Sequence, residues 1–171
     1  KAGYSVVGNH NVIIGSEANR DNNAQQVVVI GERAGLFNSG DNSVLIGHEA
    51  GRNSGAGASQ VYIGESAGHS ATATGDIAIG QQAMYAGATG GVNYAIGRYA
   101  MMDANAGSSS LASTGNIALG QSALGGTWAD ATSSYNIAIG HYSMDSALDG
   151  ASKNTAVGYQ TLSAITTGGY N

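Results

Sequence analysis

The sequence contains no cysteine and no proline, and its 171 residues include one tryptophan and one phenylalanine. Without cysteine the chain has no disulfide framework, no thiolate metal site and no cysteine nucleophile. Charged residues make up only 10% of the chain, and six Lys and Arg against eleven Asp and Glu leave a net charge of −5. The basic residues are scattered, whereas a nucleic-acid surface needs a clustered positive patch. Nucleic acid is therefore not expected as a partner.

Long hydrophobic runs are also missing. No apolar stretch approaches the roughly 20 residues of a membrane-spanning helix, so no membrane insertion is predicted. With 42% apolar residues and few charges, the composition indicates a soluble, folded chain rather than a disordered one. The chain opens Lys1-Ala2-Gly3 without a leader pattern, and we interpret it as a fragment or a processed product.

Glycine, in contrast, is abundant, with 28 residues, and one glycine recurs in a repeat. Nine units align on an aliphatic-Gly pair followed three residues later by a small residue. We number the units 1 to 9 and the positions within each unit from its first residue. The units read NVIIGSEAN, VVVIGERAG, SVLIGHEAG, QVYIGESAG, DIAIGQQAM, NYAIGRYAM, NIALGQSAL, NIAIGHYSM and NTAVGYQTL, and begin at Asn11, Val27, Ser43, Gln60, Asp76, Asn93, Asn116, Asn136 and Asn154.

A repeat of this length cannot bury its own apolar face and must stack on its neighbours. The β-branched content favours strand, and a helix would carry a destabilising glycine in every unit. We predict an all-β, parallel β-solenoid or β-roll of about nine coils of 16–23 residues. Each coil holds two short strands and two turns, and the stack is roughly 43 Å tall at ~4.8 Å per coil. Residues 1–10 form a cap or continue a preceding coil, 11–102 form the regular solenoid, and 103–171 carry longer inserted loops.

Position 5 of every unit is the shared glycine, which we expect to turn the chain sharply with a positive φ. Position 8 is small throughout, which indicates a narrow interior. Asparagine opens five units, and stacked coils would either align these amides in a hydrogen-bonded ladder or use each one only to suit its turn. The structural glycines are Gly15, Gly31, Gly47, Gly64, Gly80, Gly97, Gly120, Gly140 and Gly158.

Alternation along each strand places positions 2 and 4 on one face and position 3 on the other. The aliphatic fourth position is predicted to lie inside, so the apolar third position should face outwards. Position 3 changes from large to small at the unit where position 9 changes from small to large, so both columns should fill one shared layer. We predict that identical chains cover this layer, as a homo-oligomer and most simply a trimer; a closed monomer with every column internal is the alternative. The predicted interface comprises Ile13, Val29, Leu45, Tyr62, Ala78, Met84, Met101, Leu124, Met144 and Leu162.

Residues 154–171, NTAVGYQTLSAITTGGYN, resemble the Gly-rich repeats of bacteriophage tail fibres. DIAIGQQAM and NIAIGHYSM are also similar to the NSVAIGxxA-type repeat of trimeric autotransporter adhesin heads. The second resemblance implies a left-handed parallel β-roll arranged as a homotrimer, although the adhesin-head repeat is usually shorter and more regular. Either resemblance implies an extracellular attachment protein, on a virion tail fibre or on a bacterial surface, with a host glycan or protein as receptor.

Signals of catalysis are weak, and neither an enzyme nor a cofactor is predicted. Glu32 and Glu65 share a column two units apart on a solvated face, which does not suit a glycosidase pair. The four histidines show neither HxH nor HExxH spacing and no calcium-binding turn is present, so no metal is expected. A polysaccharide-degrading tailspike and an ice-binding solenoid remain remote alternatives. The threonines share no column, which an ice-binding array requires.

The repeat is interrupted by insertions at 103–115, 125–135 and 145–153, and loops on a rigid scaffold often carry binding residues. The middle insertion holds the only tryptophan, Trp128, with Asp130 and Tyr135 nearby. These three side chains are predicted to stack on a sugar and bind its hydroxyls. The alternative is that Trp128 folds back and covers the side of the solenoid.

Overall fold

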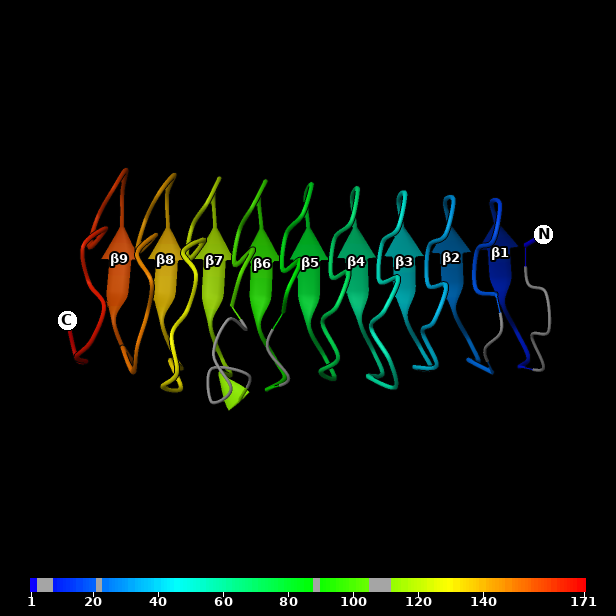
Figure 1. Ribbon diagram of the computed structural model, residues 1–171, viewed down its shortest axis with the longest axis horizontal. Helices are drawn as coiled ribbons and strands as arrows, with labels where there is room; N and C mark the ends of the chain where they lie inside the picture. Colours follow the sequence, from blue (N-terminus) through cyan, green and yellow to red (C-terminus); the bar gives the residue numbers. More distant parts are fainter. Residues whose placement is uncertain (3–7, 21–22, 88–89, 105–111) are drawn as a thin grey trace.

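The chain forms a parallel β-solenoid whose strands lie side by side in chain order (Figure 1). The structure is a computed structural model and describes residues 1–2, 8–20, 23–87, 90–104 and 112–171. The predicted cap at 1–10 and the insertion at 103–115 fall partly outside these residues. The strands of the described chain are β1 (Val12–Ile14), β2 (Val28–Ile30), β3 (Val44–Ile46), β4 (Val61–Ile63), β5 (Ile77–Ile79), β6 (Tyr94–Ile96), β7 (Ile117–Leu119), β8 (Ile137–Ile139) and β9 (Thr155–Val157).

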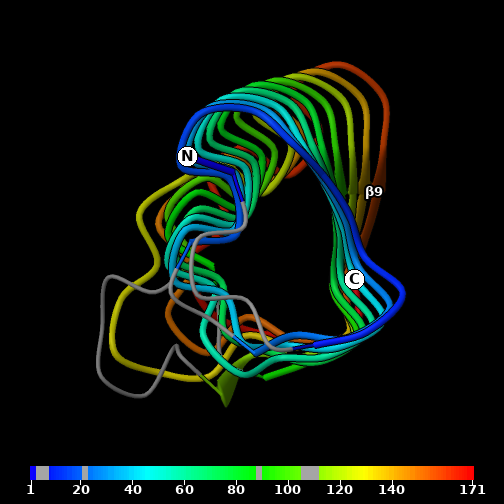
Figure 2. The ribbon, with the colours of Figure 1, turned by 90° about the vertical axis from the view of Figure 1, so that its right-hand side faces the viewer.

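Every strand pairs with the next strand in register with the repeat, so that position 2 of one unit pairs with position 2 of the next, and position 4 pairs with position 4. Val12 pairs with Val28 at one end of the stack and Ile137 with Thr155 near the other. Seen along the stack, the coils superpose as one closed outline with all strands on the same side (Figure 2). The predicted solenoid is confirmed. The prediction of two strands per coil is wrong, because each coil has one strand of three residues and completes its path by turns in the residues described.

Left-handed corners replace the second strand. Position 7, position 9 and the residue before position 1 adopt positive φ in most coils, even where the residue is not glycine. In unit 6, for example, Tyr99 has a φ of 61°, Met101 of 48° and Val92 of 63°. The shared glycine at position 5 lies between 125° and 136°, where a side chain is rarely accommodated, so its predicted role is confirmed.

The interior of the coil is formed by positions 3, 8 and 9, which reverses the faces that alternation predicted. Position 3 is buried from Val29 of unit 2 to Ala156 of unit 9, whereas positions 2 and 4 face outwards and are half-buried or exposed. Eight of the ten predicted interface residues therefore fill the interior of their own chain. Val29, Leu45, Tyr62, Ala78, Met84, Met101, Leu124 and Met144 are fully buried, Ile13 is half-buried and Leu162 is exposed in the last coil. The assignment of these eight buried residues to an axis between chains is wrong.

Volume is conserved within this interior, as the opposite trends of positions 3 and 9 predicted. A Cβ added to Gly68 would lie 2.4 Å from Cδ2 of Tyr62, and one added to Gly51 would lie 2.8 Å from Cδ2 of Leu45. Large third-position side chains thus occupy the space above the ninth-position glycines. Where position 3 becomes alanine, Met84 and its successors fill the same space from the other side.

The asparagine ladder is present. Nδ2 of Asn116 donates to Oδ1 of Asn93 at 3.1 Å, and Asn136, Asn154 and Asn171 continue the chain of bonds at 3.2, 3.1 and 2.8 Å. Each amide oxygen also accepts the backbone N–H of the next rung, as Asn116 Oδ1 does from Asn136 N at 2.9 Å. The ladder therefore satisfies buried polar groups along one edge of the sheet.

Candidate functional site

The only tryptophan lies inside the solenoid. Trp128 is fully buried, its indole N–H donates to the Leu124 carbonyl at 3.2 Å, and its backbone N–H donates to the Asp103 carbonyl at 3.1 Å. The longer coil around it bulges on the side away from the strands (Figure 2, yellow). An extra length of chain here needs a large side chain to fill the space that it encloses. The indole consequently offers no face to a ligand, and the alternative in which Trp128 folds onto the solenoid is the one observed.

Asp130 and Tyr135 remain at the surface. Tyr135 is 59% exposed and sits at the left-handed corner before β8, with its ring next to Gly115 of the coil before it. Lys153 occupies the equivalent corner of the next coil, and its ammonium lies over the ring of Tyr170. The same ammonium donates a hydrogen bond to the Tyr170 hydroxyl at 2.8 Å. Without Trp128, the predicted three-residue sugar platform is not assembled.

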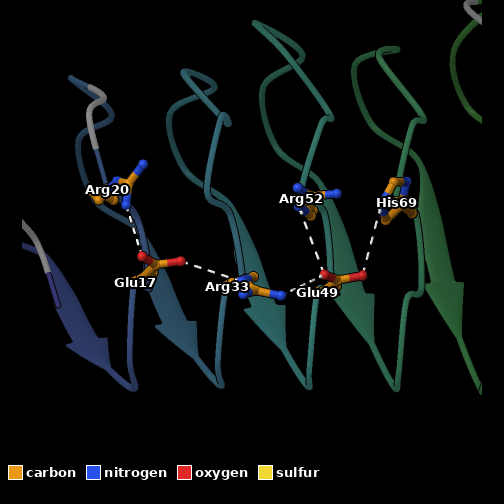
Figure 3. A network of polar contacts seen from close by, with 6 residues as sticks. All are labelled: Glu17, Arg20, Arg33, Glu49, Arg52 and His69. Carbon is orange, nitrogen blue, oxygen red and sulfur yellow. Dashed lines mark hydrogen bonds and ion pairs between the residues drawn. The ribbon is translucent and has the colours of Figure 1, made fainter. Parts of the chain in front are cut away.

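Charged side chains in units 1 to 3 form a ladder of ion pairs across coils (Figure 3). Glu17 pairs with Arg20 at 2.8 Å and with Arg33 at 3.2 Å, and Glu49 lies between Arg33 at 3.6 Å and Arg52 at 3.8 Å. The hydrogen bond that Arg33 Nε donates to Glu17, followed by the nearby charge of Glu32, raises the pKa of Arg33. Pairs this exposed contribute little to stability, because water screens them. The ladder links neighbouring coils and leaves Glu17 and Glu49 neutralised.

One carboxyl group is buried without a matching charge. Asp76 takes the place of asparagine at position 1 of unit 5; its Oδ1 accepts the Asn93 N–H at 2.8 Å, and Oδ2 has no hydrogen-bond partner. In other coils the side-chain amide at this position donates to the carbonyl three residues before the next unit, as Asn136 does to Ala151 at 2.7 Å. A carboxylate cannot make that bond. Burial raises the pKa of Asp76 to about 7.

Substituting Asp76→Asn should stabilise the protein by about 4 kcal/mol above pH 7, because the pKa of the native carboxyl lies about three units above its ordinary value. The folded state holds the extra proton between pH 4 and 7, so wild-type stability falls as the pH rises through that window. The advantage of the variant should therefore nearly vanish at pH 4. Urea unfolding at pH 4, 6 and 8 measures it, with exposed Asp130→Asn as the control. An advantage that is equal at all three pH values would contradict the assignment.

The outward side of the sheet, which we call the outer sheet face, consists of positions 2 and 4 of β1 to β9. It contains aliphatic side chains throughout, except for Tyr94 and Thr155, and no charged residue. Nine parallel strands at ~4.8 Å make it roughly 38 Å long. Ile14, Ile96 and Val157 are 57%, 41% and 64% exposed. An apolar stripe this long exceeds what isolated chains usually leave in water.

Comparisons with known proteins found no matching family model, no matching curated protein and no matching solved structure. Within the described residues, no helix is long and apolar enough to cross a bilayer, and no three His, Asp or Glu side chains gather closely enough to hold a metal ion. The fold thus defines the class of the chain, a parallel β-solenoid with one long apolar face.

Proposed function

We propose that the chain is a non-catalytic segment of an attachment fibre, assembled from three copies that cover one another's outer sheet faces. The outer sheet face carries the proposal, because its two apolar columns run the length of the solenoid without a charge. Water-exposed stripes of this size mark association sites. The stacked coils supply a stiff rod, and three copies would present every surface site three times, so that weak contacts add through avidity.

A phage tail fibre is the role we favour, on the strength of the repeat in residues 154–171. A bacterial adhesin head is the second candidate, favoured by units such as NIAIGHYSM. In both roles the assembly works outside the cell and binds a cell-surface glycan or protein. Neither role requires a cofactor or a metal.

Ile79→Glu should dissociate the assembly, because it places a carboxylate in the middle of the outer sheet face. Wild type should sediment at about three times the 17.0 kDa of one chain, and the variant at that of one chain, with its β-sheet circular dichroism retained. Gln81→Glu adds the same charge two residues away on the exposed corner and should leave the mass unchanged. A wild-type protein that sediments as a single chain would overturn the assembly.

Attachment without catalysis is tested on immobilised bacterial lipopolysaccharides and capsular polysaccharides. Wild type should be retained on at least one of them and should release no reducing sugar, and Ile79→Glu should be retained far less because it has lost avidity. Release of reducing sugar would refute the non-catalytic role. Absence of retention on every polysaccharide would count against a glycan receptor.

A further inference from the structure

A shallow hollow opens on the turns that follow β5 and β6. Its volume is about 430 Å³, and it is lined by Gln82, Tyr85, Ala86, Met102 and Asp103. The volume falls in the range of small-molecule sites. The hollow is built within one chain and lies outside the outer sheet face, so assembly is not needed to form it.

The aromatic wall of the hollow is held in place from behind. Tyr85 stacks on His69 with ring centroids 4.7 Å apart and planes 18° apart, and the tyrosine is still 37% exposed. The imidazole is fixed by Ser70, whose hydroxyl lies 2.9 Å from Nδ1, and its Nε2 lies 3.9 Å from Glu49 at the end of the ion-pair ladder (Figure 3). Burial lowers the pKa of His69, which favours the neutral form of the stacked ring. A prepositioned ring loses little entropy when a ligand stacks on it.

Two polar side chains also line the hollow, and one of them, Asp103, is held in place. Asp103 Oδ2 accepts a hydrogen bond from the Thr127 hydroxyl at 2.8 Å, and the Asp103 carbonyl accepts the Trp128 N–H. The second carboxylate oxygen of Asp103 is not used in these bonds. Gln82 adds an amide, which can both donate and accept.

We propose that this hollow binds a single neutral pyranose ring, and that it is a receptor contact of the attachment role proposed above, on which this inference rests. An aromatic face that shares a hollow with a fixed carboxylate and an amide matches a sugar, which has an apolar ring face and an edge of hydroxyl donors. Among the described residues that line the hollow there is no Lys or Arg, and the one charge is negative. Acidic sugars and phosphates are therefore disfavoured.

The methionines provide a direct readout. The chain has four, and only Met102 lines the hollow, whereas Met84, Met101 and Met144 are fully buried. In protein labelled with [13C]methyl-methionine, titration with methyl β-D-galactopyranoside and methyl β-D-glucopyranoside should shift the Met102 signal and leave the other three in place. One exposed ring stacked on a sugar should give a dissociation constant on the order of 1 mM. N-acetylneuraminic acid should cause no shift.

Two variants test the walls. Tyr85→Ala should weaken binding at least ten-fold, and Asp103→Asn should weaken it several-fold without changing the size of the side chain. Tyr135→Ala removes an exposed tyrosine elsewhere and should bind as wild type does. Unchanged signals of the three buried methionines show that a variant is folded; if Tyr85→Ala fails that check, Asp103→Asn decides.

The sugar site is overturned if neither methyl glycoside shifts the Met102 signal, or if wild type and the folded variants bind with equal affinity. Stronger binding of N-acetylneuraminic acid overturns its neutral specificity. Sedimentation of the same samples separates this result from the proposed assembly. If the protein is a trimer and the Met102 signal does not shift, only the sugar site is refuted. If the protein is a single chain and binds the sugar, only the assembly is refuted.

Discussion

Gly97→Ala should destabilise the solenoid by about 3 kcal/mol or more and open it between units 6 and 7. Gly97 has a φ of 136°, and an added Cβ would lie 2.4 Å from the carbonyl oxygen of Gly120 and 2.6 Å from its carbonyl carbon. Both neighbours are backbone atoms, which cannot rotate away. Relief requires the two coils to separate, which stretches the 2.8 Å hydrogen bond from Gly120 N to the Ile96 carbonyl.

Gly55→Ala is the matched control. Gly55 also has a positive φ, of 63°, but this lies in the left-handed region that many non-glycine corners of the solenoid adopt, and an added Cβ would meet only the Thr72 side chain at 3.6 Å. Its loss should stay near 1 kcal/mol, the cost of placing a non-glycine residue in the left-handed region. Urea unfolding followed by circular dichroism compares the two. Equal losses would show that the position-5 glycines are not required by the stacking of the coils.

The stack and its backbone requirements were predictable because each leaves a mark that repeats. A glycine at position 5 in nine units implies a positive φ, and the structure gives 125–136°. Asparagines in one column left two interpretations open, an amide ladder or a local role in each turn, and the structure shows the ladder from Asn93 to Asn171. Repetition makes such inferences strong, since stacking brings equivalent residues together whichever way the coil closes.

The inside and the outside of the sheet were not predictable from alternation, because both faces of each strand are apolar. Positions 2 and 4 are aliphatic in nearly every unit and were assigned to the core, yet position 3, which is large up to unit 4 and alanine from unit 5 on, lies inside. The coil is narrow, and the alanines at position 8, such as Ala83 and Ala100, are fully buried and leave little room across it. The balance between positions 3 and 9 was the better guide, since side chains compensate in volume where they touch.

The candidate surface site depends mainly on residues outside the nine-residue units. The repeat pattern therefore does not predict which of these side chains meet at the surface. Trp128 sits in an insertion, and nothing in the order of residues says whether its ring points in or out. Tyr85 and Asp103 come from different units and meet only because the coils stack, with Tyr85 held by His69 of the coil before it. The one local signal was that Tyr85 stands at position 10, where other coils carry residues such as Arg52.

Two substitutions in unit 4, one at position 3 and one at position 9, should each destabilise the protein and should compensate for each other when they are combined. Tyr62→Ala leaves a cavity and removes the 3.3 Å hydrogen bond from its hydroxyl to the Ala71 carbonyl, for a loss of about 3–5 kcal/mol. Gly68→Met forces a side chain into the space of the tyrosine ring, 2.4 Å from the added Cβ, and should be at least as damaging. Together they reproduce unit 5, where Ala78 and a buried Met84 fill the coil.

The backbone permits this exchange, because Met84 has a φ of 52° and Gly68 a φ of 59°. The double variant should therefore exceed each single variant by at least about 2 kcal/mol in urea unfolding, a coupling typical of side chains in contact. Tyr62→Ala with Gly35→Met is the control, since an added Cβ at Gly35 meets Leu45 and Val29 rather than Tyr62. That pair should show no rescue. Rescue in both pairs, or in neither, would mean that positions 3 and 9 do not share one layer within each coil, and the interior assigned to this solenoid would have to be redrawn.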